Sequence, residues 1–195
     1  SSLVRKSLQS LTESEPFREG NVKIVFSQAE ETPRLDCYFI PHRYPSEKEY
    51  GDGVSLKTFR YTRPDPTIKR WNETFRKEVN RFIREEGIYE ALLLDEEGCL
   101  TEGSRSNLFF IDAHDKVITA PASRVLPGIT RKYILGYCRD AGIAVSQRCI
   151  GMHEAAKMQA CFISGTSPMV LPVRRIDEME FTVDNRTLEA IMKGW

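Results

Sequence analysis

Long apolar runs are missing from this 195-residue sequence, in which the longest have about five or six residues. Crossing a bilayer takes roughly 20. An excess of one charge is missing too, because 28 Lys and Arg residues balance 28 Asp and Glu residues. Without a broad basic field, we expect neither nucleic acid nor a membrane as a partner. The sequence is that of a soluble globular chain, long enough for one large or two small hydrophobic cores.

Paired cysteines are also missing. The five cysteines are an odd number, lie far apart and include no C-x-x-C pair. This spacing fits neither a disulfide framework nor a zinc site, and the histidines show no ligand spacing either. We therefore expect no metal site, and a reducing, cytoplasmic location.

The apolar pattern predicts the elements of the N-terminal third. Residues 3–11 have helical spacing, and residues 21–39 read as two strands separated by a turn. The segment 41–66 is rich in Tyr, Pro, Gly and charged residues, and it is interpreted as a crossing between two modules.

The rest of the chain mixes helices and strands. We expect a helix of about five turns from Asp65 and Pro66 to Gly87, and a second helix from Thr130 to Ala141. Between them lie apolar runs typical of consecutive antiparallel strands, and further strands and short helices follow. Because strands and helices do not alternate strictly, the predicted fold class is α+β.

Lys69 is the first residue that invites a chemical interpretation. It lies at the start of the predicted helix, beside Ile68 and Trp71, where the helix dipole opposes a positive charge. A lysine in such surroundings can lose its proton and become a nucleophilic amine. Taken alone, however, a solvated lysine is the default interpretation.

Glu102 belongs to a polar segment, Thr101 to Asn107, that interrupts apolar strand residues. A turn with a solvent-facing carboxylate is the simpler interpretation. If the carboxylate is buried beside the strands, it needs a partner, because burying it alone costs several kcal/mol. A protonated ring nitrogen would provide that partner.

Two loops could bind an anion. The Pro-Gly loop 126–131 runs directly into a predicted helix, whose first amides favour anions; a plain turn capped by the hydroxyl of Thr130 explains it equally well. The segment 164–168 could add hydroxyl donors to the same phosphate or be a simple loop. Neither loop has the spacing of a P-loop.

The order of these features is more specific than any one of them. In this order the chain resembles the fold-type IV pyridoxal-phosphate enzymes, which include branched-chain and D-amino-acid aminotransferases and 4-amino-4-deoxychorismate lyase. The resemblance runs from about residue 21 to residue 177, and its matching segments are 68–72, 89–95, 101–109, 126–131, 165–167 and 171–173.

The resemblance implies pyridoxal 5'-phosphate as the cofactor and assigns roles to single residues. Lys69 would form the Schiff base with the cofactor aldehyde and then move the α-proton of the substrate. Glu102 would keep the pyridine nitrogen protonated. The other cofactor-binding residues implied are Ser106, Asn107, Ile129, Thr130, Gly165 and Thr166, and the substrate side would include Arg105 and Ser167.

The resemblance also implies a small N-terminal domain, here residues 1–62, followed by a larger cofactor domain, residues 63–195. Family members usually have a further stretch upstream, with an arginine that joins the phosphate site. The protein is therefore expected to be either short or a fragment, and no residue here can be assigned to that arginine.

The implied reaction is transfer of an amino group between an amino acid and a 2-oxo acid. Elimination of pyruvate by a 4-amino-4-deoxychorismate lyase is the alternative within the family. An alternative of another class is a non-catalytic relative, or an incomplete fragment, that acts as a binding module. The resemblance also implies a homodimer.

Overall fold

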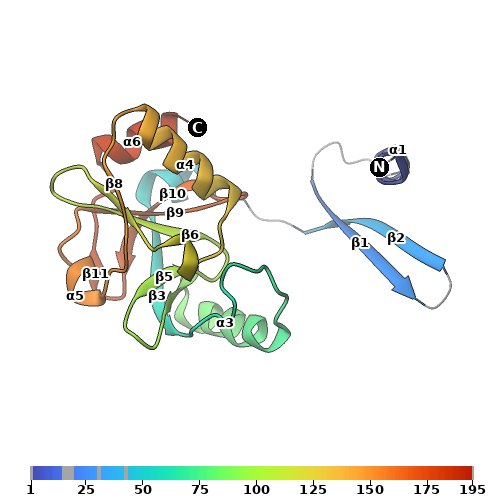
Figure 1. Ribbon diagram of the computed structural model, residues 1–195, viewed down its shortest axis with the longest axis horizontal. Helices are drawn as coiled ribbons and strands as arrows, with labels where there is room; N and C mark the ends of the chain where they lie inside the picture. The colour runs from blue at the N-terminus through green and yellow to red at the C-terminus, as the bar shows by residue number, and fades with distance from the viewer. Residues whose placement is uncertain (1, 15–19, 30–31, 42–43, 195) are drawn as a thin grey trace. The chain divides into compact units, whose positions relative to one another are not determined.

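The structure is a computed structural model that describes residues 2–14, 20–29, 32–41 and 44–194. The chain divides into two compact units, Ser1–Tyr44 and Pro45–Trp195. The smaller unit contains one helix and a two-stranded sheet (Figure 1), which confirms the elements predicted for residues 3–11 and 21–39. These elements are α1 (Ser2–Ser14), β1 (Asn21–Ala29) and β2 (Thr32–Ile40).

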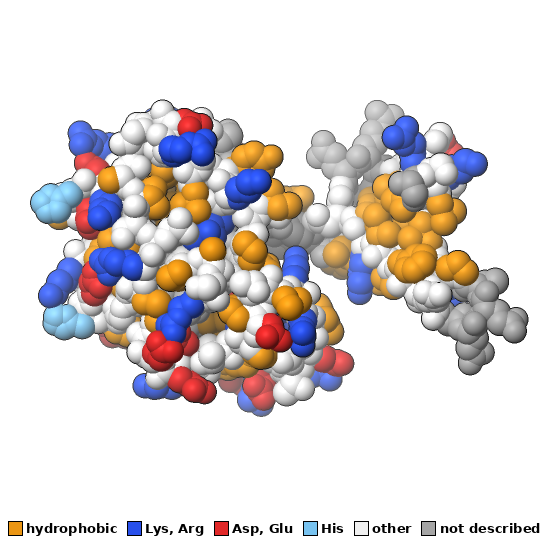
Figure 2. All heavy atoms as spheres, in the orientation of Figure 1, with side chains coloured by type: hydrophobic (Ala, Val, Ile, Leu, Met, Phe, Trp, Pro, Cys, Tyr) orange, Lys and Arg blue, Asp and Glu red, His pale blue; other side chains and the backbone are white. Residues whose placement is uncertain are grey.

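The hairpin of the smaller unit has one apolar face. β1 and β2 are antiparallel, with Ile24 opposite Cys37 and Phe26 opposite Leu35. Directly opposite residues point to the same face of a sheet, so these side chains lie together. Figure 2 shows the hydrophobic side chains gathered on this unit, where both Ile24 and Phe26 are exposed.

The larger unit is built on a nine-stranded sheet. β4, β5 and β6 are consecutive antiparallel strands, as predicted, and the strands predicted after residue 140 are present. The elements are α2 (Glu47–Asp52), β3 (Val54–Arg60), α3 (Glu73–Glu86), β4 (Glu90–Leu94), β5 (Leu100–Gly103), β6 (Asn107–Ile111), β7 (Val117–Thr119), η1 (Ala122–Arg124), α4 (Ile129–Asp140), β8 (Val145–Gln147), α5 (Met152–Ala155), β9 (Ala160–Gly165), β10 (Met169–Ile176), β11 (Met179–Glu180) and α6 (Arg186–Lys193).

Part of this sheet closes on itself. β10 pairs with β3, and the pairing continues through β4, β5 and β6. β9 then joins β6 to β10 and completes the ring. β6 pairs with β5 on one side and with β9 on the other. Residues that are distant in sequence therefore lie at the same level of the ring.

Both faces of the central strand β6 are buried. Leu108 and Phe110 belong to one hydrophobic cluster, and Phe109 and Ile111 belong to a second cluster that includes residues of α4 and α6. This alternation follows from the two-residue period of a strand. A third cluster packs α3 on β4. The fold class is α+β, as predicted.

The segment 41–66 is more ordered than the sequence analysis predicted. It contains α2, whose Ser46 forms a capping box with Glu49, and β3, which pairs in parallel with β4 and β10. The division between the two units falls within this segment, as a crossing between modules predicts, but α2 and β3 belong to the larger unit, where β3 is a strand of the ring and buries Val54 and Leu56. The contacts divide the chain at Tyr44 and Pro45, whereas the family domains predicted as 1–62 and 63–195 stay a prediction.

The first predicted helix begins later than expected. α3 starts at Glu73, because the side chain of Asn72 accepts a hydrogen bond from the Phe75 amide at 3.1 Å and caps the helix. Its predicted end at Gly87 is confirmed, with φ of 62°. The second predicted helix is shifted by one residue, to Ile129–Asp140. Among the described residues, no helix has both the length and the apolar character that a bilayer crossing requires.

Candidate active site

A cavity of about 640 Å³ brings together nearly all the predicted site residues. Its volume lies within the range of small-molecule sites, roughly 300–1,000 Å³. The predicted residues that line it are Lys69, Glu102, Arg105, Ser106, Asn107, Ile129, Thr130, Gly165 and Thr166. Ser167 is not among the lining residues; it lies in the turn between β9 and β10.

Strand register explains why three polar residues of the cavity are neighbours. Glu102 in β5 lies opposite Asn107 in β6, and Asn107 lies opposite Ser164 in β9. Opposite residues on paired strands project to the same side of a sheet. The row formed by Glu102, Asn107 and Ser164 is buried in the wall of the cavity.

Glu102 is held by three donors. Its Oε1 accepts a hydrogen bond from Arg63 Nε at 2.7 Å, and its Oε2 accepts one from the Leu126 amide at 3.0 Å. Asn107 Nδ2 donates to the same Oε2 at 3.4 Å. The Glu102 side chain is 3% exposed and that of Arg63 is 16% exposed, so the carboxylate has the partner that its burial requires.

Burial dominates the electrostatics of Glu102. Removal from water raises the pKa of this carboxyl group above its usual range, while the charge of Arg63 and the Leu126 amide oppose that rise. The protonation of Glu102 therefore depends on which cation faces it.

Asn107 joins the ring to the loop that precedes α4. Its Nδ2 donates to the Leu126 carbonyl at 2.9 Å. Gly128 follows in that loop, and a Cβ atom there would stand 2.4 Å from Asn107 Oδ1, so a larger residue would push the loop from the strand. The beginning of α4 is thus fixed to the same row of residues as Glu102.

The beginning of α4 is available to an anion. Its N-cap residue is Gly128, which contributes no side-chain hydrogen bond, so the alternative with Thr130 as the cap was wrong. Thr130 is buried in the cavity wall, and Ile129 is exposed. Ser164 also lines the cavity, and its buried hydroxyl has no hydrogen-bond partner within the described chain. Buried hydroxyl groups usually have a partner, which points to a ligand here.

Lys69 lines the cavity from an irregular segment. It precedes α3 by four residues and lies after a turn in which the Ile68 amide donates to the Asp65 carbonyl at 2.9 Å. The predicted position at the start of the helix was therefore wrong, and with it the argument from the helix dipole. The side chain is exposed, and no hydrogen bond or ion pair joins its amine to another described residue.

Glu90 was not identified as a site residue from the sequence, yet it supports the cavity floor. It is fully buried beneath the turn between β5 and β6, where it accepts hydrogen bonds from the Ser104 hydroxyl at 3.3 Å, the Ser106 hydroxyl at 2.9 Å and the Arg105 amide. Burial raises the pKa of the Glu90 carboxyl group, against these donors. A charged residue at the start of the apolar strand 90–94 was the available signal.

Arg63 and Arg76 also line the cavity, and sequence reasoning missed both. Arg63 precedes Lys69 by six residues and Arg76 follows it by seven. Because this stretch contains several basic residues, no local signal distinguished these two from solvated arginines. Their importance comes from the fold, because Arg63 meets Glu102 across 39 residues of sequence.

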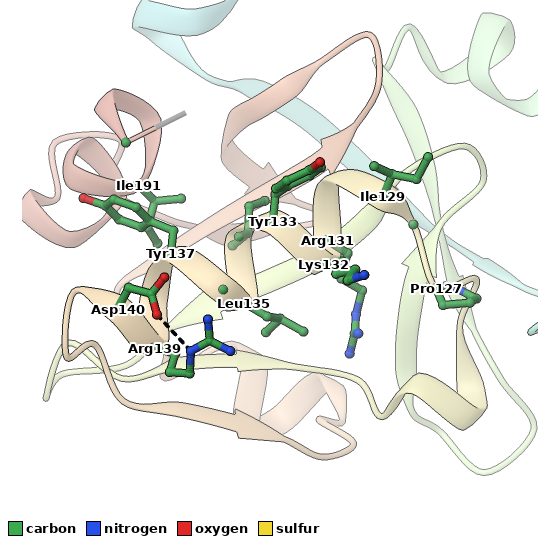
Figure 3. Close-up of a pocket in the computed structure, with 14 residues that line it drawn as sticks. Pro127, Ile129, Arg131, Lys132, Tyr133, Leu135, Tyr137, Arg139, Asp140 and Ile191 are labelled. Atoms are coloured by element: carbon green, nitrogen blue, oxygen red, sulfur yellow. Dashed lines mark hydrogen bonds and ion pairs between the residues drawn. The ribbon is translucent and has the colours of Figure 1, made fainter.

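A larger hollow of about 990 Å³ follows the outer face of α4 (Figure 3). No buried carboxylate comparable with Glu102 is found among the described residues that line it. Among the described residues that line it, the only acidic one is Asp140, which is exposed and contacts the neighbouring Arg139 at 2.9 Å. Tyr133 and Ile129, which point outward from α4 in Figure 3, are exposed as well. The smaller cavity is therefore the candidate active site.

The fold and this cavity define a class of protein, the class IV aminotransferases. The family description "Amino-transferase class IV" matches residues 1–176. The chain belongs to this family.

Individual relatives agree with this assignment. A D-alanine aminotransferase of Bacillus licheniformis is 31% identical over 150 residues, which cover 75% of this chain and 51% of the relative. A Thermotoga maritima structure assigned as a branched-chain amino acid aminotransferase has a TM-score of 0.71 at 28% identity, covering 82% of this chain and 58% of that one. A Legionella pneumophila structure assigned as a 4-amino-4-deoxychorismate lyase has a TM-score of 0.78 at 18% identity, covering 95% and 72%, and shows the fold alone. The chain spans about half the length of the curated relatives it matches.

Proposed function

We propose that the protein transfers an amino group between an amino acid and a 2-oxo acid with pyridoxal 5'-phosphate as cofactor. The observation that carries this proposal is that Lys69 and Glu102 line one cavity with the beginning of α4. An amine, a buried carboxylate and an anion-binding helix start match the three distinct parts of this cofactor, which are an aldehyde, a basic ring nitrogen and a phosphate.

The residues present fit the cofactor. Among the described residues, no side chain caps the beginning of α4, and the buried Ser164 hydroxyl has no hydrogen-bond partner. Amides at a helix start and free hydroxyl groups are the donors that a phosphate needs. Ile129, Thr130 and Thr166 would hold the phosphate group, as the sequence resemblance implies, and Ser164 is added to them.

When bound, pyridoxal phosphate supplies an aldehyde that captures amines and a ring that withdraws electrons once its nitrogen is protonated. Glu102 would hold that nitrogen in the protonated state, because a buried carboxylate stabilises a facing cation. Asn107 and the Leu126 amide keep Glu102 Oε2 in place, which leaves Oε1, now bonded to Arg63, to face a second cation. Ser106 would support the same wall through Glu90.

Lys69 would bind the carbonyl carbon of the cofactor through its amine and, once released by the substrate, move the proton at the substrate α-carbon. Its amine has no competing partner among the described residues and reaches the cavity from a segment outside the helices and strands. Such an amine is available to attack and to shuttle a proton. The homodimer and the cytoplasmic location stay predictions.

Pyruvate elimination by a 4-amino-4-deoxychorismate lyase would use the same lysine and cofactor, and the Legionella pneumophila structure shares the fold over 95% of this chain. The absorbance of the bound cofactor separates the two reactions. Mixed with a panel of amino acids, an aminotransferase converts the cofactor from the aldehyde to the amine form. A lyase leaves it as aldehyde after turnover, and a non-catalytic relative changes nothing.

A further inference from the structure

Two cysteines that lie far apart in the sequence meet in the fold. Cys99 immediately precedes β5, and Cys149 lies between β8 and α5. The Leu100 amide donates to the Ile150 carbonyl at 2.8 Å, so the residues that follow the two cysteines are joined through the backbone. The side chain of Cys149 interacts with the Cys99 thiol. No sequence spacing reveals this pair, because only the fold brings the two thiols together.

The two thiols differ in their access to solvent. Cys99 is 3% exposed, whereas Cys149 is half-buried. Burial raises the pKa of Cys99 to about 12, and the interaction with the Cys149 thiol adds to the rise. A thiol with such a pKa stays protonated at neutral pH and is a poor nucleophile on its own. A reagent that arrives from solvent therefore meets Cys149 first.

Arg124 of η1 holds Cys149 in place. Its Nη1 donates to Cys149 Sγ at 3.3 Å and to Asp95 Oδ2 at 3.1 Å. Asp95 Oδ1 in turn accepts a hydrogen bond from the Cys99 amide at 2.8 Å, so one carboxylate fixes the surroundings of both cysteines. Reactive cysteines are typically accessible and lie beside a cationic group. Cys149 has both features.

The other cysteines have different surroundings. Cys138 and Cys161 are fully buried in two separate hydrophobic clusters. Cys37 belongs to β2 of the smaller unit and lies opposite Ile24. These three residues therefore serve as internal controls for any chemistry of the pair.

We propose that Cys99 and Cys149 are a modification site at which a hydroperoxide forms a reversible disulfide bond. Cys149 Sγ attacks one oxygen of the hydroperoxide, the O–O bond breaks, and the other oxygen takes the thiol proton and leaves as water or an alcohol. Cys99 Sγ then attacks the oxidised sulfur. The S–S bond forms as the S–O bond breaks, and the Cys99 proton leaves with the departing oxygen as water.

This sequence of steps is balanced. The two thiols together lose two electrons and two protons, and the hydroperoxide gains both. Proximity compensates for the low reactivity of Cys99, because the second step takes place between groups that the fold already holds together. A disulfide of this kind is transient in a reducing environment, where thiols reverse it by exchange.

The pair lies close to the residues that hold Glu102. Cys99 precedes Glu102 by three residues, and Arg124 precedes Leu126, whose amide donates to Glu102 Oε2, by two. The disulfide would therefore join segments on which the candidate active site depends. Its formation requires neither pyridoxal phosphate nor amino transfer, so the inference stands or falls independently of the proposed function.

The test is the oxidation of the full chain with hydrogen peroxide. The protein is then blocked with iodoacetamide and digested with trypsin without reduction. Trypsin places the two cysteines in separate peptides, 85–105 and 149–157, and each other cysteine in a peptide of its own. Mass spectrometry should find these two peptides joined, with the linked pair lighter by two hydrogen atoms. Dithiothreitol should separate them.

Variants separate the two steps. In Cys99→Ser, which deprives Cys149 of its second thiol, dimedone should label Cys149 as the sulfenic acid. In Cys149→Ser, the buried Cys99 should stay unlabelled. Cys37→Ser is the matched control and should form the same linked peptides as the unaltered chain.

Three results from the unaltered chain would overturn the inference, and they hold even if a variant fails to fold. The first is recovery of peptides 85–105 and 149–157 unlinked after oxidation. The second is a sulfinic acid at Cys149 in place of the bond, and the third is a bond that joins Cys149 to Cys37 instead. Equal dimedone labelling of Cys99 in Cys149→Ser would contradict the assignment of Cys149 as the attacking thiol.

Discussion

Two sides of the same cavity treat charge in opposite ways. Glu102 is buried with three donors on its two oxygens, including an arginine, whereas Arg76 is half-buried with no acidic partner among the described residues. A buried charge that is fully paired can be part of the folded structure before any ligand arrives. Arg76 has no hydrogen-bonded acidic partner among the described residues, and the charges of Glu90 and Glu102 offset its burial only in part, so the two sides of the cavity differ in how their charges are compensated.

Removing the charge of Glu102 should have the largest effect. In Glu102→Gln we expect the rate of amino transfer to fall by about 10² or more, because a preorganised charge in a buried site is lost. Thermal unfolding should change less than in a variant that removes Arg63, because the glutamine oxygen still accepts a hydrogen bond from the partly exposed Arg63, whereas loss of Arg63 leaves a carboxylate that is 3% exposed without its cation. Glu97→Gln, which alters an exposed acid, is the matched control. Equal losses of activity and stability would indicate that Glu102 has a structural role.

Breaking the pair from the other side should affect stability. Arg63→Ala leaves Glu102 buried without its cation, so the free energy of unfolding should fall by about 2–4 kcal/mol. The pKa of Glu102 should rise further, because Arg63 now lowers it. Urea unfolding measures the first effect. An unchanged midpoint would show that solvent screens this pair.

Glu90 is a buried carboxyl group that is held by hydrogen bonds, and its effect on stability should depend on pH. Its raised pKa means that the folded protein binds a proton more tightly than the unfolded chain. The stabilisation that protonated Glu90 gives to the folded state is therefore fully present below the pKa of the unfolded chain, near 4.5. This stabilisation is lost as the pH rises through the pKa of Glu90 in the folded protein. Relative to Glu90→Gln, the wild-type melting temperature should fall between pH 4.5 and pH 8. A pH-independent difference would contradict this account.

The smallest effect is expected at an exposed pair. Lys77 and Glu73 are 2.8 Å apart on α3, with both side chains more than 60% exposed. Lys77→Ala should change the free energy of unfolding by no more than about 0.5 kcal/mol. If Lys77→Ala lowered the free energy of unfolding as much as Arg63→Ala, burial would not explain why the buried ion pair contributes more to stability than the exposed one.

Local patterns predicted much of the fold. The strand from Leu108 to Ile111 and the end of α3 at Gly87 could be predicted, because a continuous run of apolar residues and a left-handed glycine cap are local properties. The start of α3 was missed, since Asp65 with Pro66 is as good a local start signal as Asn72. β3 was also missed, because its polar flanks hide the alternation that buries Val54 and Leu56.

The site shows a similar division. The sequence order of motifs predicted that Lys69 and Glu102 work together, whereas their supports depend on contacts between distant strands. Arg63 meets Glu102 only through the fold, and the unpaired hydroxyl of Ser164 becomes significant only when burial is known. Arg63 differs neither in type nor in spacing from an ordinary surface arginine, whereas Ser164 already belongs to the segment 164–168 that the sequence offers as hydroxyl donors.

Covalent capture of the cofactor tests the central claim most directly. The full chain is mixed with pyridoxal phosphate, reduced with borohydride, digested and examined by mass spectrometry. The account predicts that the reduced cofactor is attached to the peptide containing Lys69 and that Lys69→Ala loses this label, whereas alanine at the exposed Lys77 of α3 keeps it. A Lys69→Ala protein that carries the same label within the cavity, or a wild-type protein labelled only elsewhere, would contradict the account.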